Sequence, residues 1–152
     1  MTRCNARELA VHLIYAREFT GDEPEMVIAA RLEKEYYGSL SQENAVYGDR
    51  PSHAQRAYID AVVIGVANRI EELNQIISKF SIGWDIKRIS KLSRAIMQLA
   101  IFEMQNMDDV PVSVAISEAV RIVKLYDSED AGAFVNGILG SFARSLTSEV
   151  EA

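Results

Sequence analysis

Apolar residues recur every three or four positions along most of this 152-residue chain, and no segment alternates apolar with polar residues. The first spacing places apolar side chains on one face of an α-helix, whereas alternation would indicate a β-strand. The sequence therefore predicts an all-α fold of six to seven helices. The clearest stripe consists of Val112, Ala115, Ile116, Ala119, Val120 and Val123.

Turn and capping residues divide the apolar stripes into separate helices. Gly21 is suited to end the first helix, Pro24 to begin the second, and Ser52 with Gln55 forms a capping box. The segment 38–51 is polar and is predicted to be a loop. The stripe over 52–80 is long enough to join two sub-bundles or to kink near Gly65. Helices are predicted over about 3–19, 25–37, 52–80, 90–107, 112–125 and 128–146, with a short turn over 86–90.

Composition and targeting signals predict a single cytoplasmic domain. Apolar residues make up 49% of the chain, but no apolar run approaches the ~18 residues that a membrane span requires. The first residues lack the apolar core of a signal peptide. Cys4 is the only cysteine, which excludes an intrachain disulfide and a cysteine metal cluster.

Charge is distributed unevenly along the chain, whose net charge is −6. The segment 18–49 holds eight acidic and two basic residues, and the remainder is close to neutral. An RNA partner is therefore not excluded, since binding depends on a local basic patch. Two candidate patches exist, although charge alone favours a solvated helix face for each of them. They are Arg3 with Arg7, one helical turn apart, and Lys87, Arg88, Lys91 and Arg94.

Two residues interrupt the apolar stripe of the last predicted helix. Asn136 places an amide beside the apolar pair Phe134 and Val135, and Gly137 costs roughly 1 kcal/mol relative to alanine within a helix. Two explanations remain open for this cost. The helix packs very close to another backbone, or it presents a polar group to a partner.

The sequence predicts no catalytic site. His12 and His53, the only histidines, lie in different elements; His12 is expected on a helix surface and His53 in the first turn of a helix. Neither has a Cys, Asp or Glu at a metal-binding spacing. Glu103 lies on the inward face of its helix, where an internal ion pair is the alternative to a general acid. No residue completes a catalytic group with it.

Several short motifs, in this order, resemble the NusB family of transcription antitermination factors. Each motif alone is mainly helix packing, but their joint order is specific and covers nearly the whole chain. The motifs are Ala6-Arg7-Glu8, Tyr15, Gly65-Val66, Trp84, Arg94-Ala95-Ile96, Ala100-Ile101-Phe102-Glu103, Val110-Pro111, residues 114–120, Lys124 and residues 134–139.

The resemblance implies two helical sub-bundles, at about 3–80 and 84–147, within one NusB-like domain. It implies binding to boxA RNA of ribosomal RNA leaders together with NusE, a small-subunit ribosomal protein. This pair belongs to the assembly that keeps RNA polymerase elongating through rRNA operons. Catalytic activity, cofactors and a membrane partner are not expected.

The predicted site residues combine the resemblance with the charge pattern. RNA binding is expected at Arg3, Arg7, Tyr15, Lys87, Arg88, Lys91 and Arg94. Tyr15 could present its ring to a base or pack in the core. Partner binding is expected at Asp130, Phe134 and Asn136.

This chain departs from the family pattern at three places. Only Arg3 and Arg7 stand where the family often has a run of arginines, which implies fewer phosphate contacts. Ser93 replaces a common acid, with the weakening of one polar contact to NusE as the expected effect, and Ser117 replaces a common asparagine. Two alternative functions therefore stay open: a helical interaction module without RNA binding, and an RNA-recognition domain related to that of an rRNA cytosine methyltransferase.

Overall fold

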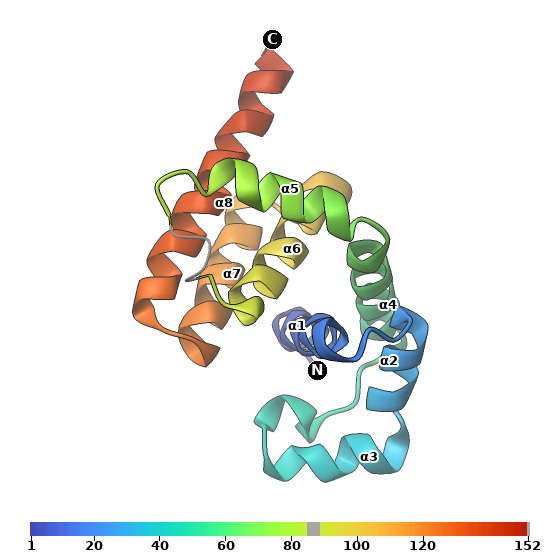
Figure 1. Ribbon diagram of the computed structural model, residues 1–152. Coiled ribbons are helices and arrows are strands. Elements are labelled where there is room, and N and C mark those ends of the chain that lie inside the picture. The colour runs from blue at the N-terminus through green and yellow to red at the C-terminus, as the bar shows by residue number, and fades with distance from the viewer. Residues whose placement is uncertain (85–88, 152) are drawn as a thin grey trace. The chain divides into compact units, whose positions relative to one another are not determined.

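The computed structural model describes residues 1–84 and 89–151, without the side chains of the last four, and this part of the chain is entirely helical (Figure 1). The all-α prediction is confirmed. The predicted count of six to seven helices was too low, because these residues form eight α-helices and two short 3₁₀ helices. The elements are α1 (Arg3–Thr20), α2 (Pro24–Arg31), α3 (Lys34–Ser39), η1 (Leu40–Gln42), η2 (Ala45–Gly48), α4 (His53–Asn68), α5 (Ile70–Phe80), α6 (Lys91–Asn106), α7 (Val112–Tyr126) and α8 (Glu129–Glu151).

The chain divides into two compact units, Met1–Asn68 and Arg69–Ala152. The stripe over 52–80 is not one helix, and it breaks at Arg69 (φ −120°, ψ 21°) rather than near Gly65. Helix α5 packs against α6 and α8, with Leu73 and Ile77 buried. The sequence had placed 70–80 in the first sub-bundle, whereas these contacts place α5 in the second unit.

Two shorter helices replace the helix predicted over 25–37. Helix α2 ends at Arg31, and the Glu33 carboxylate then caps α3 by accepting hydrogen bonds from the backbone N–H groups of Glu35 and Tyr36. The segment 38–51, predicted as a loop, contains η1 and η2. The Tyr37 hydroxyl donates to the carbonyls of Val46 (3.3 Å) and Asp49 (2.7 Å), which folds this segment back on α3.

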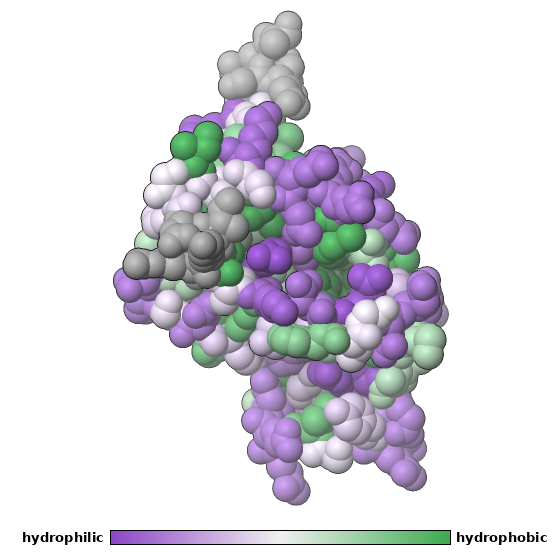
Figure 2. All heavy atoms as spheres, in the orientation of Figure 1, coloured by the Kyte–Doolittle hydropathy of each residue, from purple (hydrophilic) through white to green (hydrophobic). Residues whose placement is uncertain are grey.

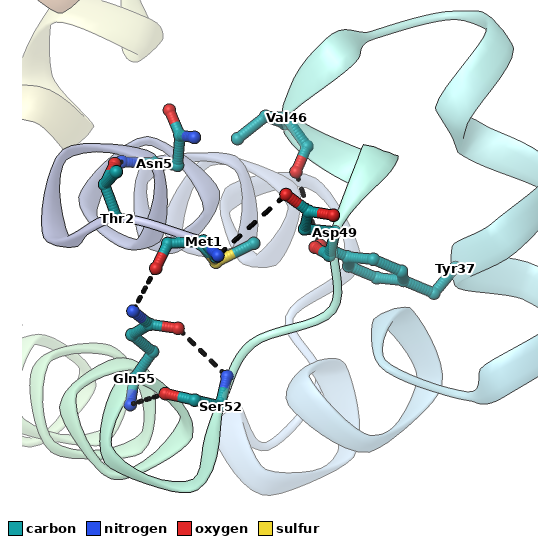
Figure 3. Close-up of polar contacts among 8 residues, drawn as sticks. All are labelled: Met1, Thr2, Asn5, Tyr37, Val46, Asp49, Ser52 and Gln55. Atoms are coloured by element: carbon teal, nitrogen blue, oxygen red, sulfur yellow. Dashed lines mark hydrogen bonds and ion pairs between the residues drawn. The ribbon is translucent and has the colours of Figure 1, made fainter.

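The start of the chain is joined to this folded segment (Figure 3). The Met1 amino group lies 4.0 Å from Asp49 Oδ2, and the Gln55 side-chain amide donates to the Met1 carbonyl. The predicted capping box is confirmed: Ser52 N donates to Gln55 Oε1 (2.9 Å), and Gln55 N donates to Ser52 Oγ (3.3 Å). Gly21 ends α1 in the left-handed conformation (φ 67°), as predicted.

A half-buried polar cluster lies inside the first unit. Arg31 Nη1 donates to the Tyr47 hydroxyl (2.7 Å), which lies 2.8 Å from His12 Nδ1. Because arginine can only donate, the Tyr47 hydroxyl accepts from Arg31, and the same hydroxyl is hydrogen-bonded to His12 Nδ1. Burial, and secondarily the Arg31 charge, lower the pKa of His12 to about 4. His12 is therefore a neutral structural residue and not the surface residue predicted from sequence.

The acidic segment faces the solvent. All eight of its acidic side chains are exposed, and the part of the first unit that holds α3, at the foot of Figure 2, carries mainly hydrophilic residues. These residues are Glu18, Asp22, Glu23, Glu25, Glu33, Glu35, Glu43 and Asp49. This surface repels polyanions.

Candidate functional site

Arg3 and Arg7 both approach the ring of Tyr58 in the first unit, but their surroundings differ. The Arg3 guanidinium lies 4.3 Å from the ring centroid and the side chain is exposed, whereas Arg7 lies 5.8 Å away and is only 4% exposed. The alternative of a solvated helix face is therefore wrong for Arg7. Sequence analysis missed Tyr58, because 55 positions separate it from Arg3.

Tyr15 forms part of an aromatic pair on α1. Its half-buried ring meets Phe19 edge to face, with centroids 4.9 Å apart, and Phe19 is 60% exposed. Tyr15 is thus only partly in the core, and part of its surface stays open to solvent. Phe19 was not among the predicted site residues, although its i,i+4 spacing from Tyr15 was the available signal.

The predicted basic cluster is placed only in part. Lys87 and Arg88 lie outside the described residues. Lys91 is exposed at the first position of α6, and Arg94 is half-buried one turn further on. Arg94 lines a pocket of about 220 Å³ with Asn74, Ile77, Ser78, Ser81 and Ile89.

The predicted partner residues Asp130 and Phe134 line a larger pocket, of about 430 Å³, in the second unit. Trp84 forms part of the same lining, and its ring centroid lies 5.8 Å from that of Phe134 at an interplanar angle of 55°. Asn136, the third predicted partner residue, is exposed on α8 and is not part of the lining. The remaining lining residues are Gly83, Ile89, Asp127, Ser128 and Ala131.

A carboxylate at the α7–α8 corner is fixed to the start of α6. Asp127 Oδ2 accepts hydrogen bonds from the hydroxyls of Ser90 (2.7 Å) and Ser93 (2.9 Å). Ser90 Oγ also accepts from the Ser93 N–H and so caps α6. Ser93, fully buried at the position where it departs from the family pattern, thus holds an acid in place.

Gly137 faces the indole of Trp84. A Cβ at this position would lie 3.6 Å from Trp84 Cζ2, which is ordinary van der Waals contact. The nearest atoms outside its own helix thus belong to a side chain, so the hypothesis of close backbone packing is wrong. The glycine leaves a flat surface on α8 beneath the indole.

Gly137→Ala should therefore raise the free energy of unfolding by about 0.5–1 kcal/mol, because alanine is the better helix former and its methyl group fits. Urea denaturation measures this change. Gly140→Ala is the matched control, since a Cβ there meets Arg144 and not the indole. If only Gly137→Ala lowers the free energy of unfolding, the Trp84 indole leaves no room for a methyl group at this position.

The order of the motifs and the two helical units can be tested against known proteins. The sequence model of the NusB family matches residues 4–144. The chain belongs to the NusB family. The resemblance noted from the sequence is thereby confirmed over almost the full length.

Curated NusB relatives cover nearly the whole chain. The transcription antitermination protein NusB of Acetivibrio thermocellus is 42% identical over 144 residues, covering 95% of this chain and 90% of the relative. The NusB of Symbiobacterium thermophilum is 33% identical over 146 residues, covering 96% and 92%. These relatives are antitermination proteins, which agrees with the prediction of a non-enzymatic factor.

Solved NusB structures share the fold. The structure of T. maritima NusB superposes with a TM-score of 0.77 at 24% identity, covering 95% of this chain and 92% of that one. A second structure, of antitermination factors NusB and NusE in complex with dsRNA, gives a TM-score of 0.72 at 23% identity, covering 94% and 96%. At this identity the likeness supports the NusB fold alone.

The other residues considered for catalysis or metal binding in this NusB chain have structural roles. Glu103 is 1% exposed on α6, which confirms its predicted inward position. Within 1–84 and 89–151, no group of three or more His, Cys, Asp or Glu residues could hold a metal ion. No helix of the described chain has the length and apolarity needed to span a membrane.

Proposed function

We propose that this protein is a cytoplasmic transcription antitermination factor that binds the boxA RNA of rRNA leaders together with a NusE-type partner. Within the elongation complex, the pair would act on RNA polymerase indirectly. NusB relatives that match nearly the whole chain support the antitermination role. A related fold solved with NusE and dsRNA supports the choice of partners.

The exposed Arg3 guanidinium, lying on the Tyr58 ring, is the observation that most directly supports RNA contact by this chain. The ring restricts the guanidinium plane while leaving its donors open to phosphate or to the face of a base. Tyr15 and Phe19 on the same helix offer aromatic surface for unstacked bases. Arg7, being buried, supports this surface from within.

The basic residues around the start of α6 would add a non-specific electrostatic contribution. Lys91 is exposed and Arg94 half-buried. Lys87 and Arg88 precede them in sequence and are assigned to this contribution on charge alone. Such contacts bind the phosphate backbone without reading sequence.

The partner would contact the start of α8. Asp130 and Asn136 are exposed there, and the half-buried Phe134 offers an aromatic anchor. If NusE raises the affinity for RNA, RNA must raise the affinity for NusE by the same factor. Both affinities can be measured on one preparation.

Arg3→Gln tests the RNA surface. We expect weaker boxA binding, with the slope of log K against log salt reduced by about 0.7, the value for one phosphate contact to a single strand. Lys34→Gln removes the same charge from an exposed position in the acidic segment and should leave the slope unchanged. An unchanged slope in Arg3→Gln would contradict the assignment. No RNA binding by the parent protein, with or without NusE, would favour the interaction-module alternative.

A further inference from the structure

We propose that Asp49 competes with RNA phosphate groups at the start of α1 and so limits the affinity of the proposed RNA surface. The inference rests on the proposed function, because it takes Arg3 as a phosphate contact. It adds an acidic residue that weakens RNA binding, which family membership does not assign. All the residues concerned lie in the first unit, Met1–Asn68.

One face of α4 holds the beginning of the chain. The Gln55 side-chain amide donates to the Met1 carbonyl. Tyr58, three residues further along α4, lies under the Arg3 guanidinium, which is 4.3 Å from the ring centroid. Because residues three positions apart share one face of a helix, Met1 and Arg3 are both held against the same turn of α4.

Asp49 reaches the same place from the folded segment 38–51 (Figure 3). Its Oδ2 atom lies 4.0 Å from the Met1 nitrogen, two residues before Arg3. Its backbone carbonyl accepts a hydrogen bond of 2.7 Å from the hydroxyl of Tyr37, a buried residue. The tyrosine therefore fixes the backbone of Asp49, while the carboxylate itself is 83% exposed and open to solvent.

Two arginines close to Asp49 in sequence are engaged in other contacts. Arg50 donates to the Leu32 carbonyl at 3.1 Å, and on α4 Arg56 is paired with Asp60 at 3.0 Å. The first turn of α1 contains no acidic residue. An anion that approaches the start of α1 therefore meets a carboxylate supplied by the segment 38–51.

The Asp49 carboxylate and an RNA phosphate would share the same cations. The Met1 amino group lies within ion-pair distance of Asp49, and the exposed Arg3 guanidinium belongs to the same end of the helix. An exposed ion pair of this kind is weak, so a phosphate can replace the carboxylate. Salt screens such charges over about 10 Å at 0.1 M, so the competition is local and strongest at low ionic strength.

Asp49→Asn tests the competition. The full-length protein is titrated with a boxA oligonucleotide in the presence of NusE and, separately, with a short oligouridine alone, at low and at high salt. We expect both RNA affinities to rise about threefold to fivefold at low salt and less at high salt, the range of an exposed charge pair. The gain should be equal for the two RNAs, because phosphate contacts carry no sequence information.

Asp22→Asn is the matched control. It removes the same charge from an exposed position beyond the other end of α1, about 27 Å away along an 18-residue helix. Both RNA affinities should stay unchanged in this variant. Asp49→Asn keeps the backbone carbonyl that Tyr37 binds, and urea midpoints verify that both variants are folded.

A double-mutant cycle with Arg3→Gln separates local competition from a change in net charge. If Asp49 competes for the phosphate that Arg3 binds, the gain from Asp49→Asn should largely disappear in the Arg3→Gln background. Tyr37→Phe removes the hydroxyl that fixes Asp49, and should give part of the gain without any change in charge.

Three outcomes would overturn the inference: an unchanged RNA affinity in folded Asp49→Asn, an equal gain in Asp22→Asn, or a gain that persists in full without Arg3. The proposed function is judged separately, by whether the parent protein binds boxA RNA together with NusE. Coupling between Asp49 and Arg3 in oligouridine binding, without binding of boxA RNA and NusE, would support the competition and overturn the proposed function. If the parent protein binds neither RNA, both fail.

Discussion

Arg7→Glu should lower the free energy of unfolding by about 3–5 kcal/mol, the range measured when a buried charge loses its compensation. Arg7 is only 4% exposed on α1, and its guanidinium lies 5.8 Å from the Tyr58 ring. The substitution places a carboxylate among groups arranged around a cation, without access to water. Urea denaturation followed by far-UV circular dichroism measures the loss.

Arg3→Glu is the matched control for this prediction. It reverses the same charge one helical turn away, over the same ring, but at an exposed position. A surface substitution of this kind changes stability by about 0.5 kcal/mol or less. A stable Arg7→Glu protein that has lost only RNA binding would show that Arg7 is available to ligand and that its buried position is wrong.

Acidification should destabilise the protein through His12, by about 3 kcal/mol between pH 6.5 and pH 4. The pKa of His12 is lowered from 6.5 to about 4 in the folded state by burial and by Arg31. Within this window the unfolded chain binds a proton that the folded chain does not, so stability falls as pH falls. Above about pH 6.5 both states are neutral and the effect vanishes. Free energies of unfolding from urea titrations at pH 7 and pH 4.5 test this.

The two histidines provide an internal comparison. Carboxylates also begin to titrate near pH 4, so the prediction concerns the difference between variants. His12→Gln should flatten the pH dependence, while His53→Gln should retain the parental profile because His53 is exposed. Equal pH dependence in all three proteins would mean that His12 titrates normally in the folded state.

Family membership and local structure could be predicted from the sequence. The ordered motifs carried the NusB resemblance, and the all-α class followed from apolar spacing. The capping box of Ser52 with Gln55 and the end of α1 at Gly21 were also correct. The apolar spacing, the capping box and the helix end depend on residues no more than about four positions apart, where backbone geometry alone decides which groups meet.

Element boundaries without a strong local signal were less predictable. The stripe over 52–80 continues through Arg69 without a glycine or proline, so only the packing of α5 on α6 and α8 reveals the break. The segment 38–51 is polar in sequence, yet Val46 and Tyr47 are buried there. Hydrogen bonds from Tyr37 to carbonyls 9 and 12 residues away organise it.

The sequence predicted which residues would form the candidate site, but not whether each of them is buried or exposed. The sequence proposed Arg3, Asp130 and Phe134 as site residues, and it gave Arg7 the same role as Arg3, because helical spacing does not distinguish a buried turn from an exposed one. Only the tertiary structure brought Asp127 to Ser90 and Ser93, across 37 and 34 positions, and Trp84 to Gly137. Burial and long-range contacts of this kind arise when helices pack together, and local sequence patterns do not encode them.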